Sequence, residues 1–251
     1  MSVALVKHSI DDGVATLVID RPKVNALNDE LMGELKDRFD ELRDEVSTRA
    51  VVLTGAGSFF SFGLDVPGYM DYSKEEFKDS FTKFAQLYAG IFEFPKPVVA
   101  AVNGHAVAMG CVFALACDYR VFVTGKAKIG LNEITFGSTL PAGVVEILKY
   151  AVGEPNAARV LYEGGIYTAD TALDLGLVHK AVEANELQTE AGAVASDLAS
   201  KNEAAFRSVK TALRGPVIEE IRRREERSIE EFVDIWYSEP VRKNLAKIEI
   251  R

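Results

Sequence analysis

The groups best suited to chemistry in this chain are backbone amides in two glycine-containing loops. The segment 54–65 (TGAGSFFSFGLD) carries glycines, which let a backbone approach a ligand closely and leave amide hydrogens unpaired. The segment 103–111 (NGHAVAMGC) leads into an apolar run that predicts a buried helix. Because the first amides of a helix have no internal acceptor, they can stabilise a negatively charged oxygen. Both loops therefore indicate main-chain donors for an anionic group.

Glu133 is the side chain whose surroundings favour proton transfer. Leu131, Ile134 and Phe136 flank it, and partial burial would raise the pKa of its carboxyl toward the range useful for a base at neutral pH. Taken alone, the pattern favours a glutamate on a surface loop. His105 beside a glycine also invites a catalytic role, but we interpret this lone histidine as structural.

Motifs for nucleotides, metals and redox cofactors are missing from the sequence. The 54–65 loop lacks the Lys-Ser/Thr ending of nucleoside-triphosphate loops and the spaced glycine triplet of dinucleotide folds. Cys111 and Cys117 lie in an apolar run, where each resembles a small buried hydrophobic residue rather than a metal ligand. We therefore expect no metal site and no separate cofactor.

The composition argues against several classes of protein. A chain of 251 residues that is 48% hydrophobic can bury a substantial core. Its net charge of -9 argues against a nucleic-acid partner, since such binding requires a basic surface that neutralises phosphates. The most apolar stretch, 97–117, is too interrupted for a membrane span, and no signal-peptide core precedes the first acidic residues. These patterns predict a cytoplasmic protein without a membrane anchor.

The first half of the chain predicts alternating strands and helices that would position the two loops. Asn28 and the Ser-Lys-Glu-Glu box at Ser73 are predicted helix caps. The alternation implies right-handed crossovers and a mostly parallel core. The predicted strands cover 14–19, 50–54, 97–102 and 119–123, and the predicted helices cover 28–45, 73–92 and 109–117.

Beyond Pro141 nearly the whole chain predicts helix. Gly215-Pro216 predicts that one helix stops and another begins, because proline suits the first turn of a helix. The charged run 222–227 is interpreted as a solvated helix face, although one edge could reach the phosphates of a ligand. The predicted helices cover 144–152, 155–163, 169–175, 186–200, 203–213 and 217–235.

Taken together, the loops resemble the crotonase superfamily of enoyl-CoA hydratases and isomerases. The resemblance covers nearly the whole chain, through RPKVNALN, SFGLD, KPVVAAVNGHAVAMGC, ALACDYRV and KIGLNEITFG in this order. The strings at 117–120 and 129–133 are most similar to mitochondrial-type Δ3,Δ2-enoyl-CoA isomerases. The resemblance implies an α/β crotonase (ClpP-like) fold, with a spiral of ββα units over 1–195. It also implies a C-terminal helical trimerisation region over 196–251 that packs against neighbouring subunits, in a homotrimer or a dimer of trimers.

The resemblance also implies a role for particular residues. Glu133 falls on the family's base position, and the backbone amides of Leu64 and Met109 fall on its oxyanion hole. Phe62 and Met109 stand where the family usually has small residues, so both could narrow the pocket. Contacts to the phosphates of coenzyme A are expected from Lys23, with Arg242 and Lys243 as further candidates. The implied coenzyme A and substrate contacts are Lys23, Val24, Ala26, Ser61, Phe62, Gly63, Leu64 and Gly110.

The reaction implied by the resemblance acts on an acyl-CoA thioester, with coenzyme A as part of the substrate. Moving a double bond from the 3,4 to the 2,3 position requires one base that removes a proton beside the carbonyl and returns one two carbons away. The family's hydratases position water with two glutamates, and the second position here holds Val112, which neighbouring Phe113 cannot replace. The sequence thus favours isomerisation. Hydration, another crotonase reaction on a CoA thioester, and a catalytically silent acyl-CoA-binding paralogue are the alternatives.

Overall fold

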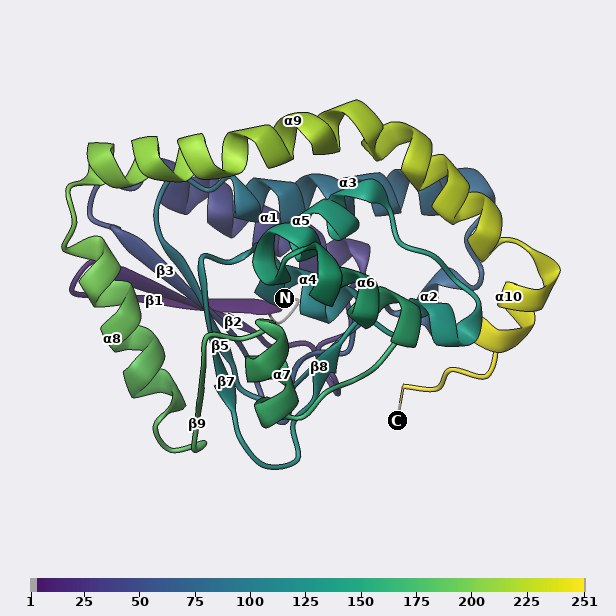
Figure 1. Ribbon diagram of the computed structural model, residues 1–251, viewed down its shortest axis with the longest axis horizontal. Helices are drawn as coiled ribbons and strands as arrows, with labels where there is room; N and C mark the ends of the chain where they lie inside the picture. The colour runs from purple at the N-terminus through teal and green to yellow at the C-terminus, as the bar shows by residue number, and fades with distance from the viewer. Residues whose placement is uncertain (1–3, 251) are drawn as a thin grey trace.

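A six-stranded sheet carries most of the core of this protein. In the computed structural model, which describes residues 4–250, its strands lie in the order β1-β2-β3-β5-β7-β9 (Figure 1). β1 and β2 are antiparallel, and every other neighbouring pair is parallel, which confirms the predicted mostly parallel core. The strands are β1 (Val6–Asp11), β2 (Val14–Ile19), β3 (Ala50–Gly55), β5 (Val98–Val102), β7 (Tyr119–Val123) and β9 (Lys180–Val182).

A second, smaller sheet holds the loops singled out in the sequence. Its parallel strands are β4 (Phe59–Ser61), β6 (His105–Val107) and β8 (Ile129–Gly130), in the order β4-β6-β8. Each short strand follows a strand of the larger sheet along the chain and precedes a helix. This repetition confirms the predicted spiral of ββα units, although the short strands themselves were not predicted.

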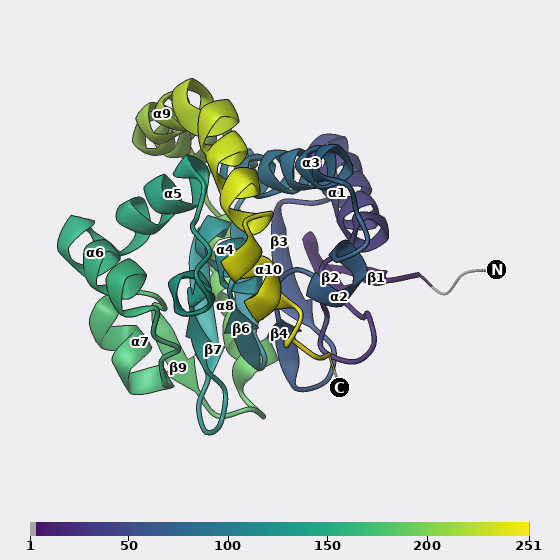
Figure 2. The same ribbon diagram turned by 90° about the vertical axis from the view of Figure 1, so that its right-hand side faces the viewer.

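Helices cover both sheets. α8 packs on β3, β5 and β7, whereas α9 crosses α3 and α5 (Figures 1 and 2). Asn28 and Ser73 cap α1 and α3 as predicted, each through a side-chain oxygen that accepts a backbone N–H. Within residues 4–250, no helix combines the length and the apolarity that crossing a bilayer requires. The helices are α1 (Asp29–Asp44), α2 (Val66–Tyr69), α3 (Lys74–Phe92), α4 (Met109–Ala116), the 3-10 helix η1 (Glu133–Phe136), α5 (Ala142–Val152), α6 (Glu154–Glu163), α7 (Ala169–Leu175), α8 (Leu187–Ala199), α9 (Glu203–Trp236) and α10 (Glu239–Leu245).

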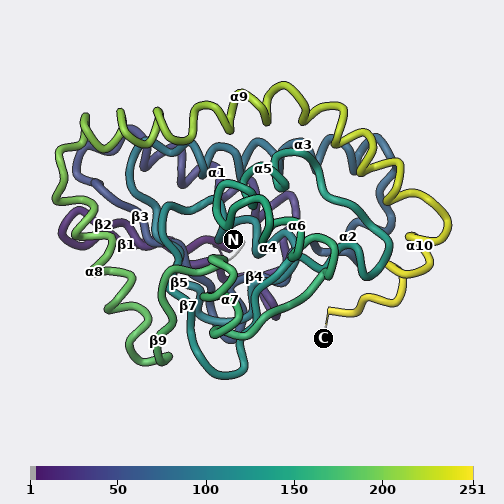
Figure 3. Tube along the Cα trace, viewed as in Figure 1, coloured from purple at the N-terminus to yellow at the C-terminus, as the bar shows by residue number. Residues whose placement is uncertain are grey.

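The predicted break at Gly215-Pro216 is wrong, because α9 runs through Pro216 as one curved helix of 34 residues (Figure 3). Proline removes one helical hydrogen bond and usually kinks or ends a helix. Tertiary contacts hold both sides of it here. Arg214 donates to the carbonyl oxygens of Phe92 at 2.7 Å and Ala116 at 3.0 Å, and Ile218 is buried on the other side.

The charged run 222–227 is mostly a solvated helix face, as predicted. Arg222 and Arg224 form surface ion pairs with carboxylates of other elements, and such pairs contribute little to stability. Glu225 is the exception. Its carboxylate accepts the N–H of Gly143 at 2.6 Å and the hydroxyl of Tyr88, so it caps α5, which has no side-chain cap of its own.

The end of the C-terminal region packs on its own chain. The Phe232 ring lies 4.2 Å from that of Phe81, and the Trp236 ring lies 4.5 Å from that of Phe77, with both partners on α3. The resemblance had assigned this region to packing against neighbouring subunits. Within the chain, α10 packs on η1, where Asn244 donates to the carbonyl oxygen of Phe136 at 3.2 Å. The packing against neighbouring subunits stays a prediction. β9 lies in the part of the chain that was expected to be helical. The strand was missed because three residues are too few to show an alternating pattern in the sequence.

Candidate active site

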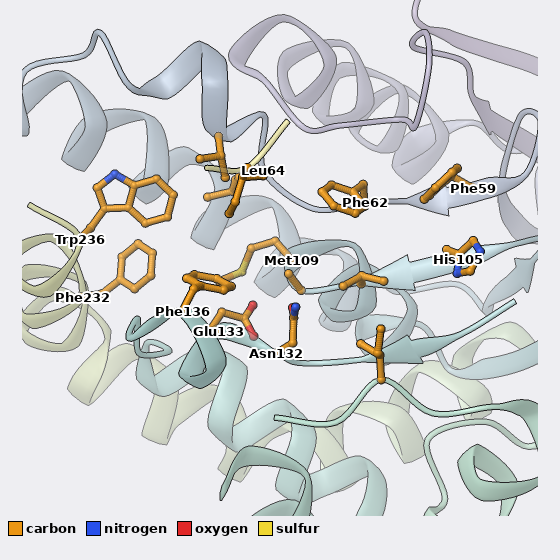
Figure 4. A pocket seen from close by; sticks show the side chains of 15 residues that line it. Phe59, Phe62, Leu64, His105, Met109, Asn132, Glu133, Phe136, Phe232 and Trp236 are labelled. Carbon is orange, nitrogen blue, oxygen red and sulfur yellow. The ribbon is translucent and has the colours of Figure 1, made fainter. Parts of the chain in front are cut away.

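A largely apolar pocket of about 430 Å³ lies between the short sheet and the end of α9 (Figure 4). Four of the residues assigned from the sequence line it, namely Phe62, Leu64, Met109 and Glu133. They come from three separate parts of the ββα repeat, namely the loop after β4, the start of α4 and the start of η1. The fold therefore brings both glycine-containing loops and the candidate base to one cavity.

The remaining assigned residues form the layer behind the pocket. Val24, Ala26, Ser61, Gly63 and Gly110 are buried and do not line it, and Lys23 is exposed. The two segments that carry them are joined, because the Phe62 N–H donates to the carbonyl of Val24 at 3.0 Å. The hydroxyl of Ser61 likewise donates to the carbonyl of Asn25 at 2.8 Å.

The cations considered for phosphate contacts differ in how they are held. Arg242 donates to the carbonyl oxygen of Met70 at 2.6 Å, and Lys243 pairs with Glu239. Lys23 has no ion pair within residues 4–250. Arg242 likewise has no ion pair among the described residues, and its Nη1 has no hydrogen-bond partner there. Lys23 and Arg242 are thus the two of these cations without a carboxylate partner among the described residues, and Lys23 is the more exposed of them.

Two backbone amides at the pocket are available to an oxyanion. The N–H groups of Leu64 and Met109 have no acceptor among the described residues. Met109 begins α4, so its amide is one of those that a helix leaves free.

Glycine is required where the two loops meet. A Cβ at Gly63 would lie 3.0 Å from the carbonyl oxygen of Val107 and 3.2 Å from the nitrogen of Met109. A Cβ at Gly110 would lie only 2.2 Å from the carbonyl oxygen of Ser61. The contact at Gly110 leaves no room for a side chain, and the φ of +101° at Gly63 is one that other residues rarely adopt. The loops therefore pack backbone to backbone, and Leu64 and Met109 line the same cavity.

Glu133 is a buried carboxyl group. It is 3% exposed, and neither of its carboxylate oxygens has a hydrogen-bond partner within residues 4–250. Burial raises the pKa of Glu133 to about 8, because the low-dielectric surroundings penalise the ionised form. A group with this pKa can take up and release a proton near neutral pH.

No second carboxylate lines the described pocket. Val112, which the resemblance places where hydratases carry a glutamate, is fully buried and is not part of the pocket lining. His105 does line it, but Figure 4 shows its ring beside Phe59, on the far side of Met109 from Glu133. Burial and the neighbouring charge of Lys128 lower the pKa of His105, which favours the neutral imidazole.

The buried carboxyl predicts that stability falls as the pH rises. The protein interior tolerates the neutral acid of Glu133 but not the carboxylate. The stability that Glu133 contributes is therefore full below pH 4.5 and is lost as the pH rises through about 8. The free energy of unfolding falls by about 1.4 kcal/mol for each unit by which the pKa in the folded state exceeds that in the unfolded state. We expect Glu133→Gln, which stays neutral, to resist urea better than the wild type at about pH 9 and to match it at about pH 4. Identical urea midpoints at the higher pH would contradict this.

Sequence reasoning missed the wall that the C-terminal region contributes. Phe232, Trp236 and Ile248 line the pocket together with Phe136 of η1. The spacing of Phe232 and Trp236, four residues apart, was the signal that places both rings on one face of a helix. Nothing local in the sequence shows which partner that face meets.

Comparison with known proteins gives a consistent result. A family model described as enoyl-CoA hydratase/isomerase matches residues 9–247. Crotonyl-CoA hydratase of Syntrophomonas wolfei is 34% identical over 204 residues, which cover 80% of this chain and 78% of that protein. Mitochondrial enoyl-CoA delta isomerase 1 of Homo sapiens is 27% identical over 243 residues, which cover 96% of this chain and 80% of that protein.

Solved structures agree closely with this fold. The crystal structure of human mitochondrial delta3-delta2-enoyl-CoA isomerase aligns with a TM-score of 0.93 at 26% identity, covering 97% of this chain and 96% of that one. The enoyl-CoA hydratase of Bacillus halodurans aligns with a TM-score of 0.89 at 26% identity, covering 98% of this chain and 100% of that one.

Proposed function

Because the chain belongs to the enoyl-CoA hydratase/isomerase family, we propose that it converts a 3-enoyl-CoA to the 2-trans-enoyl-CoA. The observation that carries this proposal is a single buried carboxyl, Glu133, beside the free backbone amides of Leu64 and Met109. Isomerisation needs one base and an oxyanion site. Hydration in this family uses a second glutamate, where this chain has Val112.

In the proposed reaction, the thioester oxygen accepts hydrogen bonds from the amides of Leu64 and Met109. Glu133 takes a proton from the carbon beside the carbonyl, which leaves an enolate whose charge the two amides stabilise. The same carboxyl then returns the proton two carbons away, so the double bond moves and no atom is gained or lost. Loss of one such donor typically costs about 3 kcal/mol of transition-state stabilisation.

Hydration is the second candidate function. It is favoured by the 34% identity to a relative named crotonyl-CoA hydratase, which exceeds the 27% identity to the isomerase relative. The buried Val112 disfavours it, because the side chain there cannot hold a water in the pocket.

Product analysis separates these candidates. The purified protein is incubated with 3-enoyl-CoA and 2-enoyl-CoA esters, and the products are identified by mass spectrometry and NMR. Isomerisation gives a product of unchanged mass from the 3-enoyl ester, whereas hydration adds the mass of one water to the 2-enoyl ester. Binding without any product would favour a silent acyl-CoA-binding paralogue.

We also propose that the protein assembles as a homotrimer or a dimer of trimers. Large apolar side chains remain exposed outside the pocket, including Tyr162 at 79%, Val209 at 59% and Leu213 at 58%. Surfaces of this kind are commonly covered in symmetric assemblies. Light scattering should therefore give a mass of three or six chains, and a monomeric mass would contradict the proposal.

A further inference from the structure

Phe59 and His105 mark one end of the pocket, here called the open end, and Phe232 and Trp236 mark the other, here called the closed end, with Glu133 between them (Figure 4). At the open end, Phe59 and His105 are partly exposed. At the closed end, Phe232 is 1% exposed and Trp236 is 3% exposed, whereas Phe136 and Ile248 of the same wall are partly exposed. The phosphates of coenzyme A must remain in contact with water or a cation, so a thioester enters through the open end. Its acyl chain then points toward Trp236.

The closed end is built from rings that support one another. The indole of Trp236 stacks on Phe77 at 4.5 Å with an interplanar angle of 21°. Phe232 packs between it and Phe81, with ring centroids at 5.8 Å and 4.2 Å. These rings come from two helices, and their supporting residues are themselves buried. Close-packed interiors do not yield readily to extra methylene groups, so this wall should not move for a longer chain.

We propose that Trp236 acts as a stop that restricts this protein to short acyl chains. The proposal adds a substrate class to the proposed function. The expected reaction rests on that function, whereas the expected binding of acyl-CoA esters does not. Each methylene that is buried should raise affinity about fourfold, the equivalent of about 0.8 kcal/mol. That gain ends at the chain length that reaches the indole, beyond which a longer chain must fold back or displace the wall.

The wild-type protein can test this directly, because Trp236 is its only tryptophan. Saturated acyl-CoA esters from acetyl to hexadecanoyl are titrated while the tryptophan emission and the affinity are recorded, with coenzyme A alone as the reference. Coenzyme A and acetyl-CoA should bind without shifting the emission. We expect the emission to shift first at the chain length where affinity stops rising.

Variants then separate the stop from the rest of the pocket. Trp236→Ala, and the milder Trp236→Leu if alanine impairs folding, should extend the rise in affinity to longer chains. The gain for chains that exceed the wild-type limit should be at least tenfold relative to the shortest ester. Phe59→Ala at the open end is the matched control, and it should weaken all chain lengths by the same factor. Thermal unfolding verifies that each variant is folded.

Two results would overturn the stop. One is a wild-type affinity that keeps rising through hexadecanoyl-CoA, and the other is a length profile that folded Trp236 variants leave unchanged. Saturated esters cannot be isomerised, so binding is read independently of turnover. A normal length profile in a protein that does not isomerise 3-enoyl-CoA would overturn the proposed function alone, whereas no binding of any ester would overturn both.

Discussion

Replacing Glu133 with glutamine should lower isomerase turnover at least about a hundredfold while acyl-CoA affinity changes little. Glutamine keeps the shape of the side chain and removes the group that carries the proton. Affinity should persist, because it comes from the apolar pocket and the two free amides rather than from this carboxyl. The measurements are kcat on a 3-enoyl-CoA and the dissociation constant of a saturated ester.

A surface glutamate provides the control for that substitution. Glu154 at the start of α6 is exposed and lies outside the pocket, so Glu154→Gln should retain wild-type turnover. Wild-type turnover in a folded Glu133→Gln protein would rule out the proton shuttle, and it would direct attention to His105 or to a bound water.

Val112→Glu should lower the free energy of unfolding by several kcal/mol at neutral pH. A carboxylate at this position would be tolerated in a pocket open to solvent and would destabilise the protein in a dry interior. Val112 is 0% exposed and does not line the cavity, so the second outcome is expected. An unpaired carboxyl buried there would have a raised pKa. The destabilisation should therefore grow as the pH rises above the ordinary range for glutamate.

Urea unfolding of Val112→Glu at acidic and neutral pH measures this effect. Val112→Met is the control for size without charge, and it should cost much less and show no added dependence on pH. A Val112→Glu protein as stable as the wild type that hydrates 2-enoyl-CoA would mean that the pocket extends to this position. The conclusion that Val112 is sealed from the pocket would then be wrong.

The sequence by itself determined the features that depend on local chemistry. The caps at Asn28 and Ser73 follow from hydrogen bonds that reach three residues along the chain. The two loops were recognisable because their glycines permit a close backbone approach and because one of them leads into an apolar run that predicts a helix. Glu133 stood out as a carboxylate among apolar neighbours, and the order of these motifs indicated the family.

Only the tertiary structure decided the features that depend on distant partners. α9 continues through Pro216 because Arg214 bonds the carbonyl of Phe92, which lies 122 residues away in the sequence. Trp236 became a wall of the pocket because Phe77 of α3, far away in the sequence, stacks against it. Val112 proved to be sealed from the cavity although it lies on the helix that the Met109 amide begins. The direction in which a helix face packs is set by the rest of the fold, and no local pattern of residues encodes it.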